Sequence, residues 1–130
     1  MNVSDPDFSI ITATWNSEKT LAECIDSVRS QIGVTVQHVI CDGKSSDGTL
    51  NIVETKMWGG LTLTSEADSG VYEAWNRGVR LATGKWILFL GSDDVLFSNT
   101  VLKDVLERIR CCSDHRLFYG MVQKESMDGA

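Results

Sequence analysis

Short apolar runs alternate along this chain with stretches of helical periodicity. The apolar, β-branched runs predict strands at residues 8–14, 34–41, 61–65, 86–90 and 117–122. Between these runs apolar residues recur three and four positions apart, which predicts amphipathic helices. Strands and helices that alternate in this way indicate an α/β fold with a doubly wound, mostly parallel sheet flanked by helices.

The run at residues 86–90 is the most continuous of the five. It is wholly apolar, stands between glycines and shows no polar alternation, which is typical of a strand buried on both faces. We therefore expect it to be a central strand of the sheet. Asp93 and Asp94 follow it closely. They would stand beyond the carboxyl end of the strand, where parallel α/β folds bind their ligands.

Asp93 and Asp94 are adjacent carboxylates that repel each other. A cation or a sugar hydroxyl between them relieves that repulsion. The alternative is a solvated turn that caps the following helix, because Asp is a common turn residue. Spacing alone leaves both interpretations open.

Acidic residues also follow the second and third predicted strands. Asp42 leaves the strand 34–41 and opens a loop, 42–49, that contains two Asp, two Gly and two Ser. Glycines let the backbone approach a ligand, and a carboxylate at this position can accept hydrogen bonds from a nucleobase or a ribose. Asp68 follows the strand 61–65 in a second acidic loop with a glycine. Acidic ends on three strands of one sheet favour a binding site.

The helix before residues 86–90 is expected to pack on the sheet. Gly78 interrupts this helix at a cost of about 1 kcal/mol relative to Ala, which a close approach of the helix to the sheet would explain. Gly84 is expected to cap the carboxyl end of the helix. The predicted inner face consists of Val71, Ala74, Trp75, Val79 and Ala82.

Composition narrows the classes of function. A chain of 130 residues with a net charge of −6 is expected to form one domain and to have no nucleic-acid partner, since nucleic-acid binders usually carry a basic patch. No apolar stretch approaches the ~20 residues of a membrane span, and the amino terminus lacks the basic region of a signal peptide. The four cysteines lack CxxC spacing. We expect reduced thiols in a cytoplasmic protein, and we assign no role to His38 or His115.

Other nucleotide-binding and signalling folds fit less well. The loop 42–49 is not a GxGxxG loop, and no Walker A pattern occurs. A receiver-like signalling domain needs an acidic pair after its first strand and a single Asp after its third. An Asp-nucleophile phosphatase also needs its Asp pair after the first strand. Here Thr14-Trp15-Asn16 ends the first predicted strand, and the pair follows the fourth.

Four segments together resemble a known family. They are residues 13–16, 42–49, 65–78 and 92–94, which are similar to the strand-end motifs of family 2 glycosyltransferases of the GT-A fold. The segment 65–78 is similar to members that build bacterial surface polysaccharides. The resemblance covers about Phe8 to Val122, and the four motifs in this order and at these spacings make it specific.

The resemblance implies a nucleotide-diphospho-sugar as the donor. By position, Asp42 matches the family's base-reading carboxylate. Thr14 and Trp15 match the segment beside the nucleobase, where the ring of Trp15 would stack. Asp68 would line the donor pocket.

The resemblance also implies a divalent ion, Mn or Mg. Asp94 would ligate this ion, and Asp93 would contact the ribose or the sugar. Hard oxygen ligands suit Mg or Mn better than Zn. The implied reaction inverts the anomeric carbon, and a carboxylate deprotonates the acceptor hydroxyl. The acceptor is an unknown saccharide or a lipid-linked one.

The chain departs from the family in its length. We expect a single donor-binding domain over residues 1–130, with a core at 6–122 and a tail at 123–130, and with the family's general base beyond the chain end. A non-catalytic nucleotide-sugar-binding module and a truncated fragment remain the alternatives. Missing strands would leave an exposed sheet edge, so homo-oligomers are a further expectation. Another is a peripheral position at the inner face of the membrane.

Overall fold

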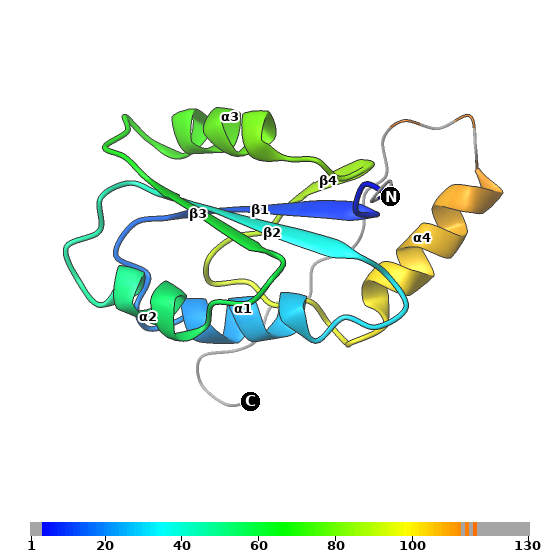
Figure 1. Ribbon diagram of the computed structural model, residues 1–130, viewed down its shortest axis with the longest axis horizontal. Helices are drawn as coiled ribbons and strands as arrows, with labels where there is room; N and C mark the ends of the chain where they lie inside the picture. Colours follow the sequence, from blue (N-terminus) through cyan, green and yellow to red (C-terminus); the bar gives the residue numbers. More distant parts are fainter. Residues whose placement is uncertain (1–3, 113, 115, 117–130) are drawn as a thin grey trace, which may run out of the picture.

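The computed structural model describes residues 4–112, 114 and 116 of the chain. The strands are β1 (Phe8–Thr14), β2 (Val36–Asp42), β3 (Leu61–Ser65) and β4 (Trp86–Phe89). The helices are α1 (Leu21–Arg29), α2 (Thr49–Thr55), α3 (Val71–Leu81) and α4 (Val101–Cys111). Strands and helices alternate from β1 to α4, as the sequence predicts (Figure 1).

Two expectations from the sequence concern a fifth strand and membrane-spanning segments. The strand predicted at residues 117–122 lies outside the described residues. Within the described residues, no helix combines the length and the apolarity that crossing a bilayer requires.

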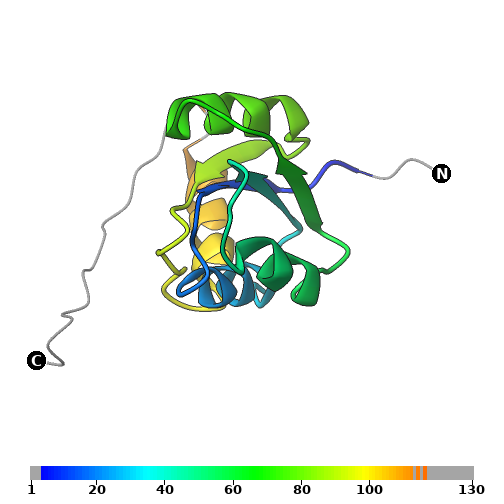
Figure 2. The same cartoon turned by 90° about the vertical axis from the view of Figure 1, so that its left-hand side faces the viewer.

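The four strands form one parallel sheet in the order β3-β2-β1-β4. α3 lies over one face, and α1, α2 and α4 lie under the other (Figure 1, Figure 2). The predicted doubly wound arrangement is therefore confirmed. The register pairs Thr14 with Asp42 and Asp42 with Ser65. Because these residues end their strands, the loops after β1, β2 and β3 begin side by side at one edge of the sheet.

The core lies on both faces of β1 and β2. On the α3 face, Ile11 and Val39 pack with Ala74. On the opposite face, Ile10 packs against α1 and α4, and Ile40 packs against α1 and α2. Successive residues of a strand point to opposite faces, so two apolar neighbours such as Ile10 and Ile11 serve two different helical layers.

Within the described residues β4 pairs with β1 alone. That it is a central strand stays a prediction, because the strand predicted at residues 117–122 lies outside the described residues. Trp86 and Leu88 pack against the core cluster that includes α4. Ile87 and Phe89 face the other way and remain 42% and 44% exposed. On this face α3 packs mainly on β1 and β2, and Trp75 of α3 lies against Phe89 with ring centroids 4.8 Å apart. An apolar run therefore does not show how completely each face of a strand is covered.

The predicted inner face of α3 is confirmed at Ala74, Trp75 and Ala82 and is wrong at Val71 and Val79. Val71 and Val79 are 44% and 42% exposed. The residues that the helix buries are Ala74, Arg77 and Gly78. The small side chains at Ala74 and Gly78 let the helix lie close to the sheet, and Trp75 and Ala82 pack against the core cluster that contains Ala74.

The explanation proposed for Gly78 is confirmed. A Cβ atom at this position would lie 2.5 Å from Ile11 Cγ2 and 3.1 Å from Cys41 Sγ. Both neighbours are fully buried and cannot move into solvent. The glycine therefore sets the distance between α3 and the sheet.

We expect Gly78→Ala to lower the free energy of unfolding by about 1 kcal/mol, because overpacking (about 1–3 kcal/mol) exceeds the gain in helix propensity (about 1 kcal/mol). Urea unfolding monitored by circular dichroism measures this loss. Gly59→Ala is the control, since a Cβ there meets nothing within 4 Å. A more stable Gly78→Ala protein would mean that α3 lies further from the sheet.

The prediction that Gly84 caps the carboxyl end of α3 was wrong. α3 ends at its C-cap residue Ala82. A Cβ at Gly84 would lie 2.4 Å from the backbone nitrogen of Ser9 and 2.7 Å from its hydroxyl oxygen. Gly84 is therefore required where the chain passes against β1 on its way into β4.

The cysteines agree with the expectation of reduced thiols. All four are free, and Cys24 and Cys41 are buried. Burial raises the pKa of the Cys24 thiol to about 12. A thiol with such a pKa stays protonated and unreactive, so Cys24 is a core residue.

Candidate functional site

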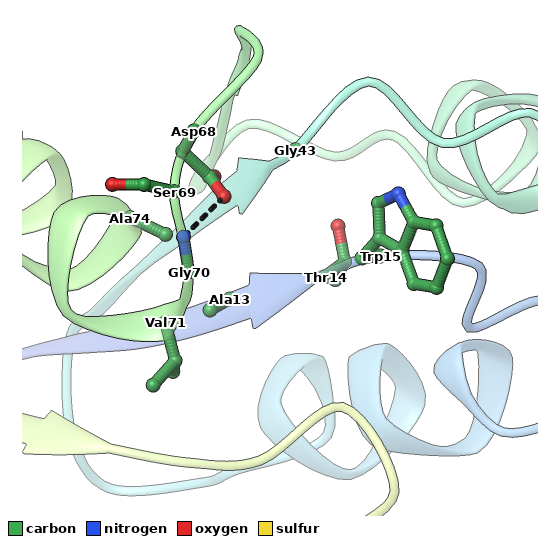
Figure 3. Close-up of a pocket in the computed structure, with 9 residues that line it drawn as sticks. All are labelled: Ala13, Thr14, Trp15, Gly43, Asp68, Ser69, Gly70, Val71 and Ala74. Carbon is green, nitrogen blue, oxygen red and sulfur yellow. Dashed lines mark hydrogen bonds between the residues drawn. The ribbon is translucent and has the colours of Figure 1, made fainter.

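A cleft of about 420 Å³ opens at the carboxyl edge of the sheet (Figure 3). The end of β1, the residue after β2, the loop before α3 and the start of α3 form its walls. The lining residues are Ala13, Thr14, Trp15, Gly43, Asp68, Ser69, Gly70, Val71 and Ala74. The structure thus brings three of the predicted site residues, Thr14, Trp15 and Asp68, to one cleft.

Trp15 is the aromatic residue of this cleft. It follows β1 directly and is 68% exposed, and Figure 3 shows its indole next to Thr14. A large exposed aromatic ring beside a cleft is suited to stack on a planar ligand. Stacking of Trp15 on a nucleobase, which the family resemblance implies, stays a prediction.

Asp42 is buried and is not among the residues that line the cleft. Its Oδ1 accepts hydrogen bonds from the hydroxyls of Thr14 (2.7 Å) and Ser45 (2.6 Å). Its Oδ2 accepts from the Ser45 backbone N–H (2.9 Å) and from the Ser65 hydroxyl (3.0 Å). Because a carboxylate has about four acceptor positions, the protein itself satisfies Asp42 and joins the ends of β1, β2 and β3 through it.

These donors decide the charge of Asp42. Burial alone would raise the pKa of the carboxyl group, but the hydrogen bonds from Ser45, Thr14 and Ser65 outweigh burial and hold its pKa below the ordinary value. Asp42 is therefore ionised at neutral pH. To accept an N–H from a nucleobase, it must exchange one of its present donors.

Asp68 lines the cleft and has more acceptor capacity left. Its side chain is 13% exposed. Oδ1 accepts from the Gly70 backbone N–H at 3.2 Å (Figure 3), and Oδ2 lies 3.7 Å from Nη2 of Arg77. A Cβ at Gly43 would stand 3.0 Å from Oδ2. Glycine at this position therefore lets the Asp68 carboxylate lie against the end of β2.

Asp93 and Asp94 lie in the exposed loop after β4 and do not line the cleft. The Gly91 N–H donates to Asp94 Oδ2 (3.2 Å), and the Asp94 N–H donates to the Gly91 carbonyl (3.0 Å). A Cβ at Gly91 would be 2.6 Å from Asp94 Oδ2 and 3.1 Å from Asp93 Oδ1. Both carboxylates therefore fold over Gly91. The alternative of a helix cap does not hold, because Thr100 is the N-cap of α4.

The loops at this edge are joined to one another by hydrogen bonds. The Ser17 hydroxyl donates to the Ser92 hydroxyl (3.0 Å), which connects the loop after β1 to the loop of the Asp pair. The Asn16 side-chain oxygen accepts from the Ser46 N–H (2.9 Å) and the Asp47 N–H (3.3 Å), which connects the loop after β1 to that after β2. Asn16 has a positive φ of 50°. The loops after β1, β2 and β4 are thus joined by hydrogen bonds into one platform.

The Asp pair fits a hard divalent ion that is shared with a ligand. Across residues 4–112, 114 and 116, no group of three or more His, Cys, Asp or Glu side chains could hold a metal without further ligands. Mg²⁺ is typically held by one or two carboxylates plus the phosphate oxygens of a substrate. Asp93 and Asp94 supply such a pair of carboxylates.

Arg77 is a residue of this region that the sequence analysis did not identify. It is 7% exposed, and its Nη2 donates to the backbone carbonyl of Asp42 at 3.1 Å. A signal was available in the sequence, because Arg77 lies on the same helical face as Ala74 and Gly78. A charged residue on a packed face is unusual, and unusual positions often belong to sites.

Comparison with known proteins extends these observations. The Glycosyl transferase family 2 model matches residues 9–114. A PGL/p-HBAD biosynthesis glycosyltransferase of Mycobacterium bovis is 42% identical over 120 residues, which cover 90% of this chain and 47% of that protein. This chain therefore spans about half the length of that relative.

Solved structures show the same architecture. Staphylococcus aureus TarS 1-349 in complex with UDP has a TM-score of 0.72 at 33% identity, over 80% of this chain and 32% of TarS. The mannosyltransferase PcManGT of Pyrobaculum calidifontis, in complex with GDP-Man and Mn²⁺, has a TM-score of 0.74 at 24% identity, over 82% of this chain and 33% of that protein. At that identity the second likeness concerns the fold alone. The family match over most of the sequence and the shared architecture show that this chain belongs to glycosyl transferase family 2 and has the GT-A fold.

Proposed function

We propose that this chain binds the nucleotide-diphospho-sugar donor of a glycosyltransferase. The observation that carries the proposal is the cleft at the carboxyl edge of the sheet, where Thr14, Trp15 and Asp68 meet beside the platform that holds the Asp93-Asp94 loop. The UDP in the TarS crystals supports a nucleotide as the ligand class. Titration of nucleoside diphosphates identifies the base that this chain prefers.

The residues of the cleft divide the work of nucleotide binding. Trp15 stacks on the base, and Gly43 allows the ligand to approach the backbone. Asp42 reads the base when one of its hydroxyl donors turns away, and until then it keeps Thr14 in place. Asp68 contributes a second carboxylate at the wall of the cleft.

Asp94 ligates a divalent ion, Mn or Mg, and Asp93 contacts the ribose or the sugar. When bound, such an ion offsets the charge of the diphosphate and stabilises the charge that develops on it as it leaves. The oxygen donors of the Asp pair support this choice of ions. The Gly91 N–H fixes one oxygen of Asp94, so the carboxylate keeps its place in the loop.

The overall reaction of the enzyme is an inverting transfer to an acceptor hydroxyl, which a carboxylate deprotonates in line with the departing diphosphate. The acceptor is a saccharide or a lipid-linked one, in the synthesis of bacterial surface polysaccharide or glycolipid. The name of the mycobacterial relative supports this class of product. We place the reaction in the cytoplasm, at the inner face of the membrane.

Calorimetric titration of UDP, GDP and dTDP, with and without Mn²⁺, tests the donor site. We expect one nucleotide to bind in a metal-dependent manner, and Asp94→Ala to weaken this binding at least ~10-fold, since even outer-shell partners of metal ligands cost about 10–100-fold. Asp104→Ala, which removes an exposed carboxylate of α4, is the control.

Three outcomes separate the alternatives. No binding of any of the three nucleotides by the folded chain contradicts the donor site. Binding that is equally strong without metal and in Asp94→Ala contradicts the metal site alone. Metal-dependent binding without hydrolysis or transfer of the matching nucleotide-sugar favours the non-catalytic binding module.

A further inference from the structure

The sheet-facing side of α3 carries one charged residue, Arg77. Its neighbours on that face are Ala74 and Gly78, which are small enough to bring the helix against Ile11. The guanidinium therefore enters a layer that otherwise consists of close-packed apolar groups. Burial of a charge is costly unless other groups pair with it and accept its hydrogen bonds.

Arg77 joins the end of β2 to the loop before α3. Nη2 donates to the Asp42 carbonyl (3.1 Å) and lies 3.7 Å from Asp68 Oδ2. Nε lies 3.9 Å from Glu66 Oε2. The backbone N–H of Glu66 donates to the same Asp42 carbonyl (2.9 Å). One side chain thus fixes two acidic residues of the loop relative to the strand that ends beside them.

The guanidinium of Arg77 lacks some of its hydrogen bonds, which is not expected of a buried residue that only stabilises the fold. A guanidinium has five N–H donors. In the described part of the chain, Nε is buried and has no hydrogen-bond partner. An apolar side chain of similar volume would avoid this cost, since replacing a buried ion pair by apolar residues is often neutral or stabilising. The arrangement therefore points to a role in the adjacent cleft.

The adjacent cleft contains a carboxylate that needs such a partner. Four protein donors already satisfy Asp42. Within the part of the chain that the structure describes, Asp68 accepts one hydrogen bond, from the Gly70 N–H at 3.2 Å, and it lines the cleft with further acceptor positions. Among the described residues, Arg77 is the cation within 4.0 Å of it.

We propose that Arg77 is a positioning residue that holds the Asp68 carboxylate in the wall of the cleft, where Asp68 accepts a hydrogen bond from the ring N–H of the donor's nucleobase. This inference rests on the proposed donor site. For uracil and thymine, whose nucleotides have a single ring N–H, Asp68 takes this N–H in place of Asp42, which keeps its four protein donors. The ring N–H gives the site a selection rule. Uracil, thymine and guanine carry a ring N–H, whereas the rings of cytosine and adenine present acceptors at the corresponding positions.

A double-mutant cycle tests the coupling between Arg77 and Asp68. The dissociation constant of the preferred nucleoside diphosphate is measured with Mn²⁺ for the wild type, Arg77→Met, Asp68→Asn and the double variant. We expect each single variant to bind ~10-fold more weakly, and the double variant to bind no more weakly than Asp68→Asn. Arg77→Lys, which keeps the charge but loses the forked donor, is expected to fall between wild type and Arg77→Met.

A matched control and a stability measurement separate positioning from structure. Glu66→Gln changes the other carboxylate near Arg77, whose side chain is 66% exposed, and it should leave the dissociation constant unchanged. Melting temperatures are recorded for every variant. If Arg77→Met does not fold, the cycle is run with Arg77→Lys, whose loss of affinity must likewise vanish in the Asp68→Asn background.

The outcomes are distinct. Wild-type binding with equal effects of the Arg77 change in both Asp68 backgrounds means that Arg77 acts on structure only, and it overturns this inference while the donor site stands. Equally tight binding of CDP or ADP and of the preferred nucleotide overturns the selection rule. Absence of nucleotide binding by the folded wild type overturns the donor site and this inference together.

Discussion

Lowering the pH from 7 to 4 is expected to reduce the free energy of unfolding by about 3 kcal/mol through His38 alone. Burial lowers the pKa of this histidine from 6.5 to about 4. The folded protein therefore keeps His38 neutral at a pH where the unfolded chain already binds a proton. Since most small domains are stable by only about 5–15 kcal/mol, such a loss is a large share of the total.

The direction of the effect follows from which state binds the proton. Above pH 6.5 neither state is protonated at His38, and its full contribution to stability is present. Between pH 6.5 and about 4 only the unfolded state takes up the proton, so stability falls as the pH falls. Below about pH 4 both states are protonated and His38 adds no further loss.

The surroundings of His38 explain why protonation is resisted. The side chain is fully buried on β2, and its Nε2 shares a hydrogen bond of 2.8 Å with the Thr12 hydroxyl. Its Nδ1 has no hydrogen-bond partner in the described part of the chain. An imidazolium here would carry a buried charge and a second N–H without an acceptor, which is unfavourable in an apolar core.

Urea unfolding at pH 7, 5.5, 4 and 3 measures this dependence. His38→Gln can keep a hydrogen bond to Thr12 but does not titrate, so its stability should change little between pH 6.5 and 4. A wild-type profile as flat as that of the variant would contradict the buried neutral histidine. A decline confined to pH below 4 would instead point to carboxylates such as Asp42.

The order of the elements follows from the sequence because it depends on local periodicity. Apolar runs and helical spacing depend on neighbours within a few residues, so they identify β1 to α4 correctly. The exposure of Ile87 and Phe89 on β4 depends on where α3 lies, which is a tertiary contact. The same limit explains the buried face of α3. Gly78 and Ala74 set the approach of that helix, and no count of apolar residues reveals that small residues decide which face is buried.

The sequence likewise predicts some features of the site and not others. Strand ends are predictable, and with them the positions of Thr14, Trp15 and Asp68 at one cleft. The sequence does not reveal that protein donors saturate Asp42, because Ser45 and Ser65 come from different loops and strands. It also does not reveal the distance between the cleft and the Asp93-Asp94 loop. Both depend on side-chain rotamers and loop conformations, which periodicity does not encode.

Asp42→Asn is expected to lower the free energy of unfolding at pH 7 by about 3 kcal/mol, because several hydrogen bonds to a charged acceptor, worth about 1.5–3 kcal/mol each, are weakened or lost. The amide group of Asn keeps one oxygen acceptor. Its NH₂ group points a donor at the Ser45 N–H, which cannot accept, and the Ser65 hydroxyl keeps a bond to it only by turning to accept. The ends of β1, β2 and β3 then lose the acceptor that joins them.

Asp42→Asn is also expected to change how the free energy of unfolding depends on pH. The pKa of Asp42 is lowered in the folded protein, so the carboxylate stabilises the fold above its unfolded pKa, near 4, and that contribution is lost as the pH falls through the folded value. Asp42→Asn should make this acid decline smaller, while Asp47 and Glu73, whose pKa values are also lowered by hydrogen bonds, keep their share of it. The His38 decline between pH 6.5 and about 4 should stay intact. The two windows lie side by side, so a single set of urea curves separates them.

Ser65→Ala is the matched control for Asp42→Asn, because it deletes one donor, at 3.0 Å, and leaves the carboxylate in place. A loss of about 1 kcal/mol is expected for this control. If Asp42→Asn costs no more than Ser65→Ala, the four donors do not act through the charge of Asp42. A large loss for Asp42→Asn beside a small one for Ser65→Ala would mean that this carboxylate fixes the edge of the sheet on which the donor cleft is built.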